Sequence, residues 1–299
     1  MNKKAFTAIF LLLAASLLFG QGSIKFKDDR GISISLPRKA TRIVSLSPEL
    51  TEILFAIGAG HTVVGVTTYC NYPKEALSIT KIGGFSAKTI SIESIIALKP
   101  DVIVGNINTH QLLIPAFEKA GLQFVAAENS GIVSVFNNIS LFGMISGNEA
   151  KAEALNAELK KRFDAVKAKT SGIKEDKKPV VFWETWDEPL MSAGPNSFTG
   201  ELIVAAGGRN AFYDASQDWP IVSFEAVLAR NPDWIMAPDT HGEALTIERL
   251  SKRPGWPTLK AVKAKQIYLM DGDLAARACP RFIEAVETMA KILYPELFK

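Results

Sequence analysis

The sequence has few of the residues that most enzymes and metal sites require. Its 299 residues include three histidines, His61, His110 and His241, which form no HExxH pair and no local pair with metal-ligand spacing. A zinc or manganese site is therefore not expected. The sequence also lacks a GxSxG nucleophile motif and a GxxxxGK[ST] phosphate-binding loop. These absences argue against the commonest hydrolases and nucleotide-binding enzymes, and only a catalytic triad assembled from distant residues stays open.

An excess of charge of one sign is also absent. The chain has 34 Lys and Arg against 31 Asp and Glu, with a formal net charge of +3, and no block of basic residues suggests a nucleic acid partner. Hydrophobic residues make up 47% and charged residues 22%, which is typical of a globular protein and not of a multispan membrane protein. The length is sufficient for two lobes, each with its own core.

The first residues have the pattern of a signal peptide. The basic start "MNKK" precedes the apolar run "AFTAIFLLLAASLLFG", and Gly20 and Gly22 are candidate cleavage points. We expect a signal peptide over residues 1–22 and a secreted or periplasmic protein, with a retained single-span anchor as the alternative. The first cysteine is Cys70, so a lipid-modified cysteine near the cleavage point is not expected.

A β-α-β unit follows. Arg42 to Leu46 reads as a buried strand, and Ser47 and Pro48 are suited to begin the next helix. Gly58 and Gly60 end that helix, and Val63 to Val66 restarts a strand. A dinucleotide-binding fingerprint needs its glycines between the strand and the helix, whereas here they follow the helix. The unit therefore predicts a parallel sheet covered by helices, without a nucleotide site.

The chain repeats this plan. "SIESIIALKPDVIV" from Ser91 matches "SFEAVLARNPDWIM" from Ser223, an offset of 223 − 91 = 132 residues. Each copy reads as a capped helix, a Pro-Asp turn and a buried strand. A second similarity is found between "TEILFAIGAG" from Thr51 and "GELIVAAGG" from Gly200. We therefore expect two Rossmann-like α/β lobes with parallel sheets, over residues 42–147 and 178–299.

One long helix is expected to join the lobes. The stretch "NEAKAEALNAELKKRFDAVKAK", from Asn148, has no Gly or Pro, and its apolar residues recur at helical spacing. The predicted linking helix covers residues 148–172, before a polar loop. A single helix is a stiff connector, so we expect only modest hinge bending.

Aromatic side chains follow strands of both predicted lobes. Ligands of parallel sheets bind at the carboxyl ends of the strands, where aromatic rings can clamp a large flat molecule. The alternative is that the rings simply fill the cores. The candidates are Tyr69, Tyr72 and Phe85 in the first lobe and Trp183, Trp186 and Trp219 in the second.

Charged candidates fall in two groups. "DGDLAARACPRF" places Asp273, Arg277 and Arg281 just before the last helix, either as a polar rim that contacts a ligand or as an ordinary helix start. Glu93 and Glu225 occupy equivalent first turns of two helices, where the helix dipole favours a carboxylate. They could also form a matched pair of docking points for arginines of a partner.

Taken in order, these stretches resemble the periplasmic substrate-binding proteins of cobalamin, ferric-siderophore and haem ABC importers. The resemblance runs from about Arg42 to Tyr294 and rests on five stretches. They are "RIVSLSPELTEILFAIGAG", "VVGVTTYCNYP", "ISIESIIALKPDVIVG", "DWPIVSFEAVLARNPD" and "DGDLAARACPRFIEA". It implies two lobes bridged by one helix, a ligand between them, no catalysis, no cofactor, no bound metal of its own, and a monomer that delivers its ligand to a permease and ATPase complex.

Within that family the sequence is most similar to the cobalamin-binding type. The resemblance implies that Tyr69, Trp219, Asp273 and Arg277 line the cleft. Phe85 stands where a tryptophan is common, and "WETW", with Trp183 and Trp186, replaces a phenylalanine-containing stretch, so haem and siderophores remain alternatives to a corrinoid. The resemblance also implies that Glu93 and Glu225 dock to arginines of the permease.

The two cysteines are unusual in this setting. The resemblance puts Cys70 and Cys279 on opposite walls of the cleft. A disulfide between them would hold the lobes shut, which a binding cycle does not favour. We therefore expect free thiols, or a contact from Cys70 to the ligand or its metal.

Overall fold

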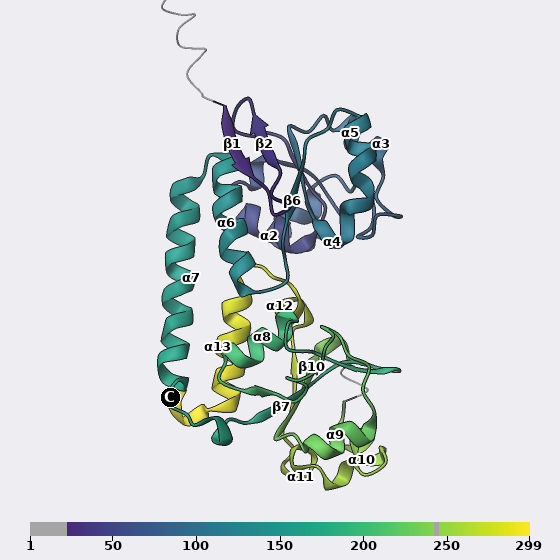
Figure 1. Ribbon diagram of the computed structural model, residues 1–299, viewed down its shortest axis with the longest axis vertical. Helices are drawn as coiled ribbons and strands as arrows, with labels where there is room; N and C mark the ends of the chain where they lie inside the picture. Colours follow the sequence, from purple (N-terminus) through teal and green to yellow (C-terminus); the bar gives the residue numbers. More distant parts are fainter. Residues whose placement is uncertain (1–22, 242–244) are drawn as a thin grey trace, which may run out of the picture.

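The chain folds into two α/β lobes spanned on one side by a long helix (Figure 1). The computed structural model describes residues 23–241 and 245–299. The predicted signal peptide, residues 1–22, lies outside this part of the chain. Within the described residues, no helix is both long and apolar enough to cross a membrane.

The first lobe contains a four-stranded parallel sheet with the order β4-β3-β5-β6. Its strands are β3 (Ile43–Ser45), β4 (Val63–Val66), β5 (Val102–Asn106) and β6 (Phe124–Ala127). Its helices are α2 (Pro48–Ala56), α3 (Ile92–Ala97), α4 (Ile107–His110), α5 (Ile114–Lys119) and α6 (Ile132–Ser146). Because β4 and β5 lie on opposite sides of β3, the connections diverge there and leave a crevice at the carboxyl ends of the strands.

A hairpin precedes the predicted start of this lobe at residue 42. Strands β1 (Ile24–Lys27) and β2 (Ser33–Leu36) pair antiparallel. The buried Asp28 in their turn is paired with Arg30 at 2.6 Å and accepts a hydrogen bond from the Ala126 amide of β6. The hairpin is therefore fixed to the lobe by a buried polar contact as well as by Ile34 and Leu36.

The second lobe contains a mixed sheet with the order β11-β10-β7-β8, and β9 also pairs with β7. Its strands are β7 (Val180–Asp187), β8 (Leu190–Ser192), β9 (Arg209–Asn210), β10 (Trp234–Pro238) and β11 (Ile267–Met270). Its helices are α8 (Phe198–Ala205), α9 (Phe224–Arg230), α10 (Ile247–Lys252), α11 (Lys260–Ala264), α12 (Gly272–Ala276) and α13 (Phe282–Leu293). The two α/β lobes are as predicted, except that β8 runs antiparallel to β7 because a tight turn joins them.

The sequence repeat corresponds to a structural repeat. Ser91 and Ser223 each accept a hydrogen bond from a backbone amide in the first turn of α3 and α9. Lys99 and Asn231, again 231 − 99 = 132 positions apart, both have left-handed backbones, with φ of 46° and 44°. Equivalent helices therefore end in the same way, and each leads through a Pro-Asp turn into a central strand of its lobe.

Helix α7 (Glu149–Thr170) occupies the region of the predicted linking helix and runs along both lobes (Figure 1). Its buried residues are Ala152, Leu159, Val166 and Thr170. A bidentate ion pair between Arg162 and Glu287, with both distances 2.9 Å, ties it to α13.

The two lobes do not have wholly separate cores. One continuous apolar cluster runs from α2 through α6 and α7 to α8 and α13, and each lobe adds a smaller cluster on its far side. Relative movement of the lobes would expose part of this shared cluster to water, at about 25 cal/mol for each Å² of apolar surface. The packing therefore supports a stiff connection between the lobes.

Candidate ligand site between the lobes

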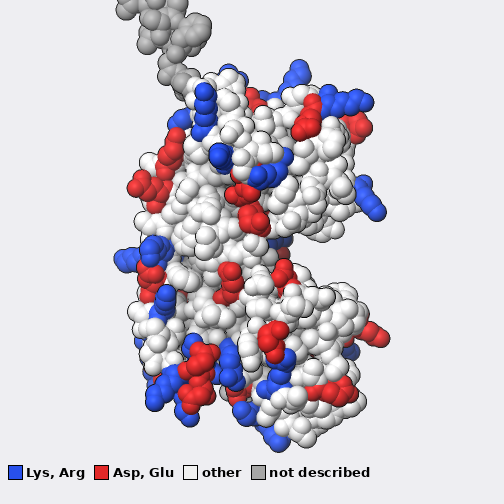
Figure 2. All heavy atoms as spheres, viewed as in Figure 1, with Lys and Arg blue, Asp and Glu red and all other residues white. Residues whose placement is uncertain are grey.

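The carboxyl edges of the two sheets face each other. Helix α2, which follows β3, and Asn71, which follows β4, both contact residues that follow β11 of the second lobe. Because strands that run parallel end at the same edge of a sheet, the loops after β7 and β10 lie at this edge too. Figure 2 shows the hollow between the lobes, open on the side away from α7.

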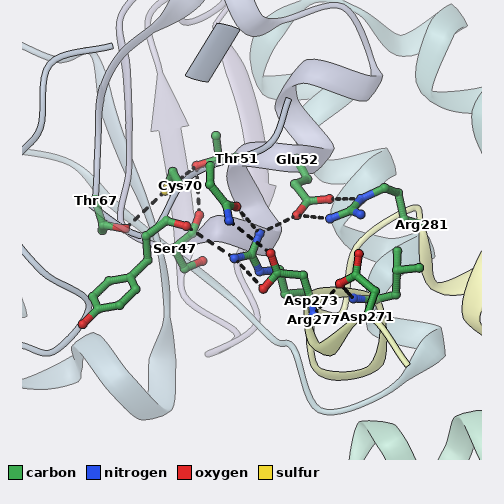
Figure 3. A network of polar contacts seen from close by, with 12 residues as sticks. Ser47, Thr51, Glu52, Thr67, Cys70, Asp271, Asp273, Arg277 and Arg281 are labelled. Carbon is green, nitrogen blue, oxygen red and sulfur yellow. Dashed lines mark hydrogen bonds and ion pairs between the residues drawn. The ribbon is translucent and has the colours of Figure 1, made fainter. Parts of the chain in front are cut away.

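The contact between the lobes is centred on Glu52 of α2, whose side chain is 2% exposed. Arg281 binds both of its carboxylate oxygens, at 2.7 and 2.9 Å, and Arg277 binds Oε1 at 2.9 Å (Figure 3). Arg277 also donates to Asn71 at 2.7 Å and is paired with Asp273 at 2.8 Å. The Arg281 guanidinium lies 4.0 Å from the centroid of the Tyr72 ring.

This network stabilises the buried negative charge of Glu52. An isolated buried carboxylate is costly, and the bidentate Arg281 together with Arg277 offsets that cost. The Cys279 thiol lies within the same network, and its pKa is raised well above the usual range by burial and by the nearby Glu52 carboxylate. Cys279 is therefore a neutral, buried thiol that does not compete with Glu52 for the arginines.

A cavity of about 600 Å³ adjoins this network. The first lobe contributes residues that follow β3, β4 and β6 and a loop between β4 and α3, and the second lobe contributes the end of α12. The lining residues are Pro48, Glu49, Thr68, Tyr69, Gly84, Phe85, Ser86, Thr89, Asn129, Ala276 and Arg277. Tyr69, Phe85 and Arg277 were candidates from the sequence, and the fold brings these three together.

Two of the polar lining residues could not be recognised from the sequence. Glu49 is 5% exposed and accepts a hydrogen bond from Asn129 Nδ2 at 3.1 Å. Burial raises the pKa of Glu49, and hydrogen bonds to its carboxyl and the charge of Arg277 partly oppose that rise. In the sequence, Glu49 reads as an ordinary acidic residue in a first helical turn, and only the fold turns it towards a cavity.

Phe85 is held in the cavity wall by His110, which is buried in the first lobe. His110 Nε2 lies 3.1 Å from the Phe85 carbonyl oxygen, and Nδ1 lies 3.0 Å from the Asn106 amide nitrogen. Nδ1 also lies 3.1 Å from the Asn106 carbonyl oxygen. A neutral ring with its proton on Nε2 donates to Phe85 and accepts from the Asn106 amide, and a charged ring donates to both carbonyls. The rings of Phe85 and His110 also pack edge to face, with centroids 5.7 Å apart. Burial lowers the pKa of His110, although donation from the ring to the Phe85 and Asn106 carbonyls, which favours the charged form, opposes this.

The remaining polar and aromatic candidates, Asp273, Trp186 and Trp219, belong to the second lobe and are not among the residues that line the cavity. Asp273 does not line the cavity but contacts both Arg277 and Asn71 across the lobes. Trp186, at the end of β7, is 52% exposed and donates from Nε1 to the Glu188 carbonyl. Trp219 is 40% exposed and lies in a segment that pairs with β8, since the Ser192 amide donates to the Pro220 carbonyl. Trp186 therefore lies on β7, and Trp219 lies in an irregular segment beside β8, the strand next to β7.

Two of the predicted ligand-binding residues are buried away from the cavity. Trp183 is 2% exposed and belongs to the shared apolar core, because alternate residues of β7 point into it. Cys70 is 1% exposed, and its Sγ lies 3.3 Å from Thr51 Oγ1 and 3.2 Å from Thr67 Oγ1 (Figure 3). Neither side chain reaches the cavity. The prediction of free thiols is confirmed, since Cys70 and Cys279 are both unpaired and buried.

A second hollow, of about 780 Å³, lies between α6, α7 and α8. Its walls are largely apolar, with Phe136, Phe163 and Val204 among them, and it contains none of the residues predicted to bind a ligand. It also lacks residues from the carboxyl ends of the strands. The smaller cavity between the sheet edges is therefore the better candidate for the ligand site.

Replacement of Glu52 tests the contact between the lobes. Glu52→Gln keeps the size of the side chain but leaves two buried arginines without their carboxylate, so we expect a loss of about 3 kcal/mol in the free energy of unfolding. Urea denaturation followed by circular dichroism measures it. Glu118→Gln, an exposed glutamate of α5, is the matched control, with an expected change within about 0.5 kcal/mol. A loss below about 1 kcal/mol for Glu52→Gln would contradict the assignment.

The pH dependence of stability tests the state of His110. Its pKa in the folded protein is below the ordinary 6.5, so the unfolded ring takes up a proton first as the pH falls. The stability that the neutral ring provides is complete above about pH 6.5 and is lost below it, as the pH falls through the folded pKa. We expect the stability difference between the wild type and His110→Gln to shrink from pH 7.5 to pH 5 in urea titrations.

The exposed His61 provides the control for this measurement. His61→Gln should follow the wild-type pH dependence. A difference between wild type and His110→Gln that is constant with pH would show that His110 does not titrate as described.

The chain matches the family model described as "Periplasmic binding protein" over residues 43–274. It is 30% identical to the uncharacterized ABC transporter substrate-binding lipoprotein YvrC of Bacillus subtilis, with all of both chains covered. It is also 30% identical to the vitamin B12-binding protein of Salmonella choleraesuis, over 85% of this chain and 90% of that protein.

Solved structures agree with the fold. The periplasmic heme-binding protein RhuT of Roseiflexus superposes with a TM-score of 0.75 at 26% identity, over 86% of this chain and 99% of that one. Residues 43–274, which the family model matches, contain the carboxyl edges of both sheets and the cavity residues from Pro48 to Asn129. The chain therefore belongs to the periplasmic binding protein family of ABC transporter substrate-binding proteins.

Proposed function

We propose that the protein captures cobalamin or a related corrinoid outside the cytoplasm and delivers it to the permease of an ABC importer. The observation that supports this most is the cavity between the sheet edges, with aromatic and polar residues in one wall. The similarity to a vitamin B12-binding protein over 85% of the chain supports a corrinoid as the ligand.

The residues around the hollow are suited to bind a large ring without reacting with it. Tyr69 and Phe85 on the first lobe, and Trp186 and Trp219 on the second, supply aromatic surface for the apolar parts of a macrocycle. Arg277 and Asp273 supply donors and acceptors for amide or carboxylate groups at its edge. Within the described residues, no group of three or more His, Cys, Asp or Glu side chains could hold a metal ion.

The site is largely formed before the ligand arrives. Arg277 is already held by Glu52, Asn71 and Asp273, and Phe85 by His110. Side chains that are ordered in advance lose little conformational entropy on binding, which favours affinity. Binding of the intact ligand as a monomer, without chemical conversion, is the mechanism that we propose.

The proposed location outside the cytoplasm rests on the sequence and on relatives. Residues 1–22 have the pattern of a signal peptide. The relatives include a lipoprotein and proteins described as periplasmic. We infer that the chain is exported by this segment.

Haem is the second candidate, because Tyr69 lines the cavity and is 59% exposed. A tyrosine phenolate can bind haem iron directly. The heme-binding protein of Roseiflexus has the same fold. A ferric siderophore would use the same aromatic and arginine surface. The three ligands differ in their absorption spectra, so binding can be compared directly.

Titration of the purified protein with cyanocobalamin, haem and a ferric siderophore tests the proposal. Calorimetry and absorption spectra should show one cyanocobalamin bound per chain, more tightly than the other two. Tyr69→Ala should weaken that binding about tenfold, because a large aromatic contact in the cavity wall is lost. Tyr213→Ala, an exposed tyrosine that does not line the cavity, is the control and should bind as the wild type does. No binding of any corrinoid would overturn the proposed function.

We further propose that Glu93 and Glu225 dock to arginines of the permease. Both are exposed and lie at equivalent positions of α3 and α9, one on each lobe. Figure 1 shows both helices on the side away from α7. Hydrogen bonds from its own backbone amide and from the Ser223 hydroxyl lower the pKa of Glu225, so this carboxylate is charged at neutral pH.

Charge reversal separates docking from ligand binding. The double variant Glu93→Arg and Glu225→Arg should bind cyanocobalamin with unchanged affinity, because neither residue lines the cavity. It should fail to support uptake when supplied with the cognate permease, since like charges then face each other. The same reversal at the exposed Glu118 and Glu296 is the control for net charge. Normal uptake by the Glu93 and Glu225 variant would refute the docking role.

A further inference from the structure

Glu49 is a buried carboxyl group that the proposed binding mechanism has not yet used. It lies in the first turn of α2, directly after the Ser47-Pro48 turn at the end of β3. It is 5% exposed, yet it is part of the cavity wall. Its small exposed area therefore faces the space that a ligand would fill.

The charged groups around Glu49 are few and mostly engaged. Among the residues that line the cavity, the other titratable side chains are Tyr69, which follows β4, and Arg277, which follows α12. Arg277 is bound to Glu52, Asn71 and Asp273, and it acts on Glu49 only as a nearby positive charge.

The nearer polar neighbours do not neutralise Glu49. Glu52 lies one turn further along α2 and is neutralised by Arg277 and Arg281. Asn129, after β6, is uncharged and donates one hydrogen bond to Glu49 Oε1. His110 contacts the Phe85 carbonyl behind the cavity wall and is itself held neutral.

A carboxyl group in this position favours one kind of ligand group over another. A buried carboxylate without a counter-ion gains a hydrogen bond when a ligand N–H donor reaches it. A ligand carboxylate at the same point either meets a like charge or must share one proton with Glu49. The raised pKa of Glu49 agrees with a site where additional negative charge is costly.

We propose that Glu49 is a specificity-determining residue of the ligand site, which accepts a hydrogen bond from a carboxamide N–H of the ligand and disfavours a carboxylate there. This inference rests on the proposed function and deepens it. It selects macrocycles with carboxamide side chains, such as corrinoids, over macrocycles with free carboxylates, such as haem. Asn129 positions the carboxyl, and Arg277 offers a donor for the amide oxygen.

The test compares ligands that differ by one functional group. Cyanocobalamin is titrated beside its monocarboxylic acid derivatives, in each of which one peripheral carboxamide is hydrolysed. We expect the wild type to bind at least one of these acids about tenfold more weakly than cyanocobalamin at pH 7.5, the loss of one hydrogen bond to a charged group. In Glu49→Gln, whose amide can donate to a carboxylate, that preference should fall below about threefold.

The pH profile provides a second readout. In the wild type, a ligand carboxylate beside Glu49 must share one proton with it. The affinity for the disfavoured acid should therefore rise as the pH falls from 7.5 to 5.5. The affinity for cyanocobalamin should stay level over the same range. Glu49→Gln should remove the difference between the two profiles. Haem, titrated in parallel, should bind Glu49→Gln more tightly than the wild type.

The outcomes separate the two proposals. If the wild type binds cyanocobalamin but Glu49→Gln keeps the full preference for the amide, the role of Glu49 is wrong and the proposed function stands. If the wild type binds haem and no corrinoid, the proposed function is wrong, and so is the selection for carboxamides. Glu118→Gln, with the same change of charge on the exposed α5, should behave as the wild type.

Discussion

The interaction of Glu52 with Arg277 and Arg281 is the constraint on which the site depends. It places a carboxylate of the first lobe between two guanidinium groups of the second, out of contact with water. Such a pair is expensive to desolvate, so hydrophobic residues could have joined the lobes at least as stably. The charged contact also fixes the orientation of Arg277. Glu52 holds its guanidinium in place, and the same side chain lines the cavity.

The same constraint explains how the cavity has a fixed shape although it lies between two lobes. The shared core along α6, α7 and α13 limits movement on one side, and the Glu52 network limits it at the inner end of the hollow. The open side is left to α3 and α9, which carry the exposed glutamates. The hollow is therefore rigid at its inner end and open to solvent on the opposite side. This arrangement is suited to binding a ligand without a large conformational change.

The sequence predicts the repeated plan well, because helix caps and turn residues are local features. Ser91 and Ser223, with their Pro-Asp turns, indicate equivalent units without any knowledge of contacts. The hairpin β1–β2 was not predicted, since its short strands are held by the distant Ala126. Trp183 and Cys70 were predicted to line the cleft, but the fold buries both, because one residue along a strand or loop decides between cleft and core.

The sequence did not identify Glu49 as a residue of the ligand site, and only the fold shows that it lines the cavity. Glu49 and Glu52 lie three positions apart on one helix, so their side chains share one face of it. Glu52 binds two arginines and forms part of the contact between the lobes, and Glu49 accepts a hydrogen bond from an amide and lines the cavity. The difference lies in partners more than 75 positions away in the chain, Asn129 for one and Arg277 and Arg281 for the other. A buried carboxyl whose hydrogen-bond donors are all uncharged is stabilised further by a donor on the ligand, which makes its charge a means of selecting the ligand.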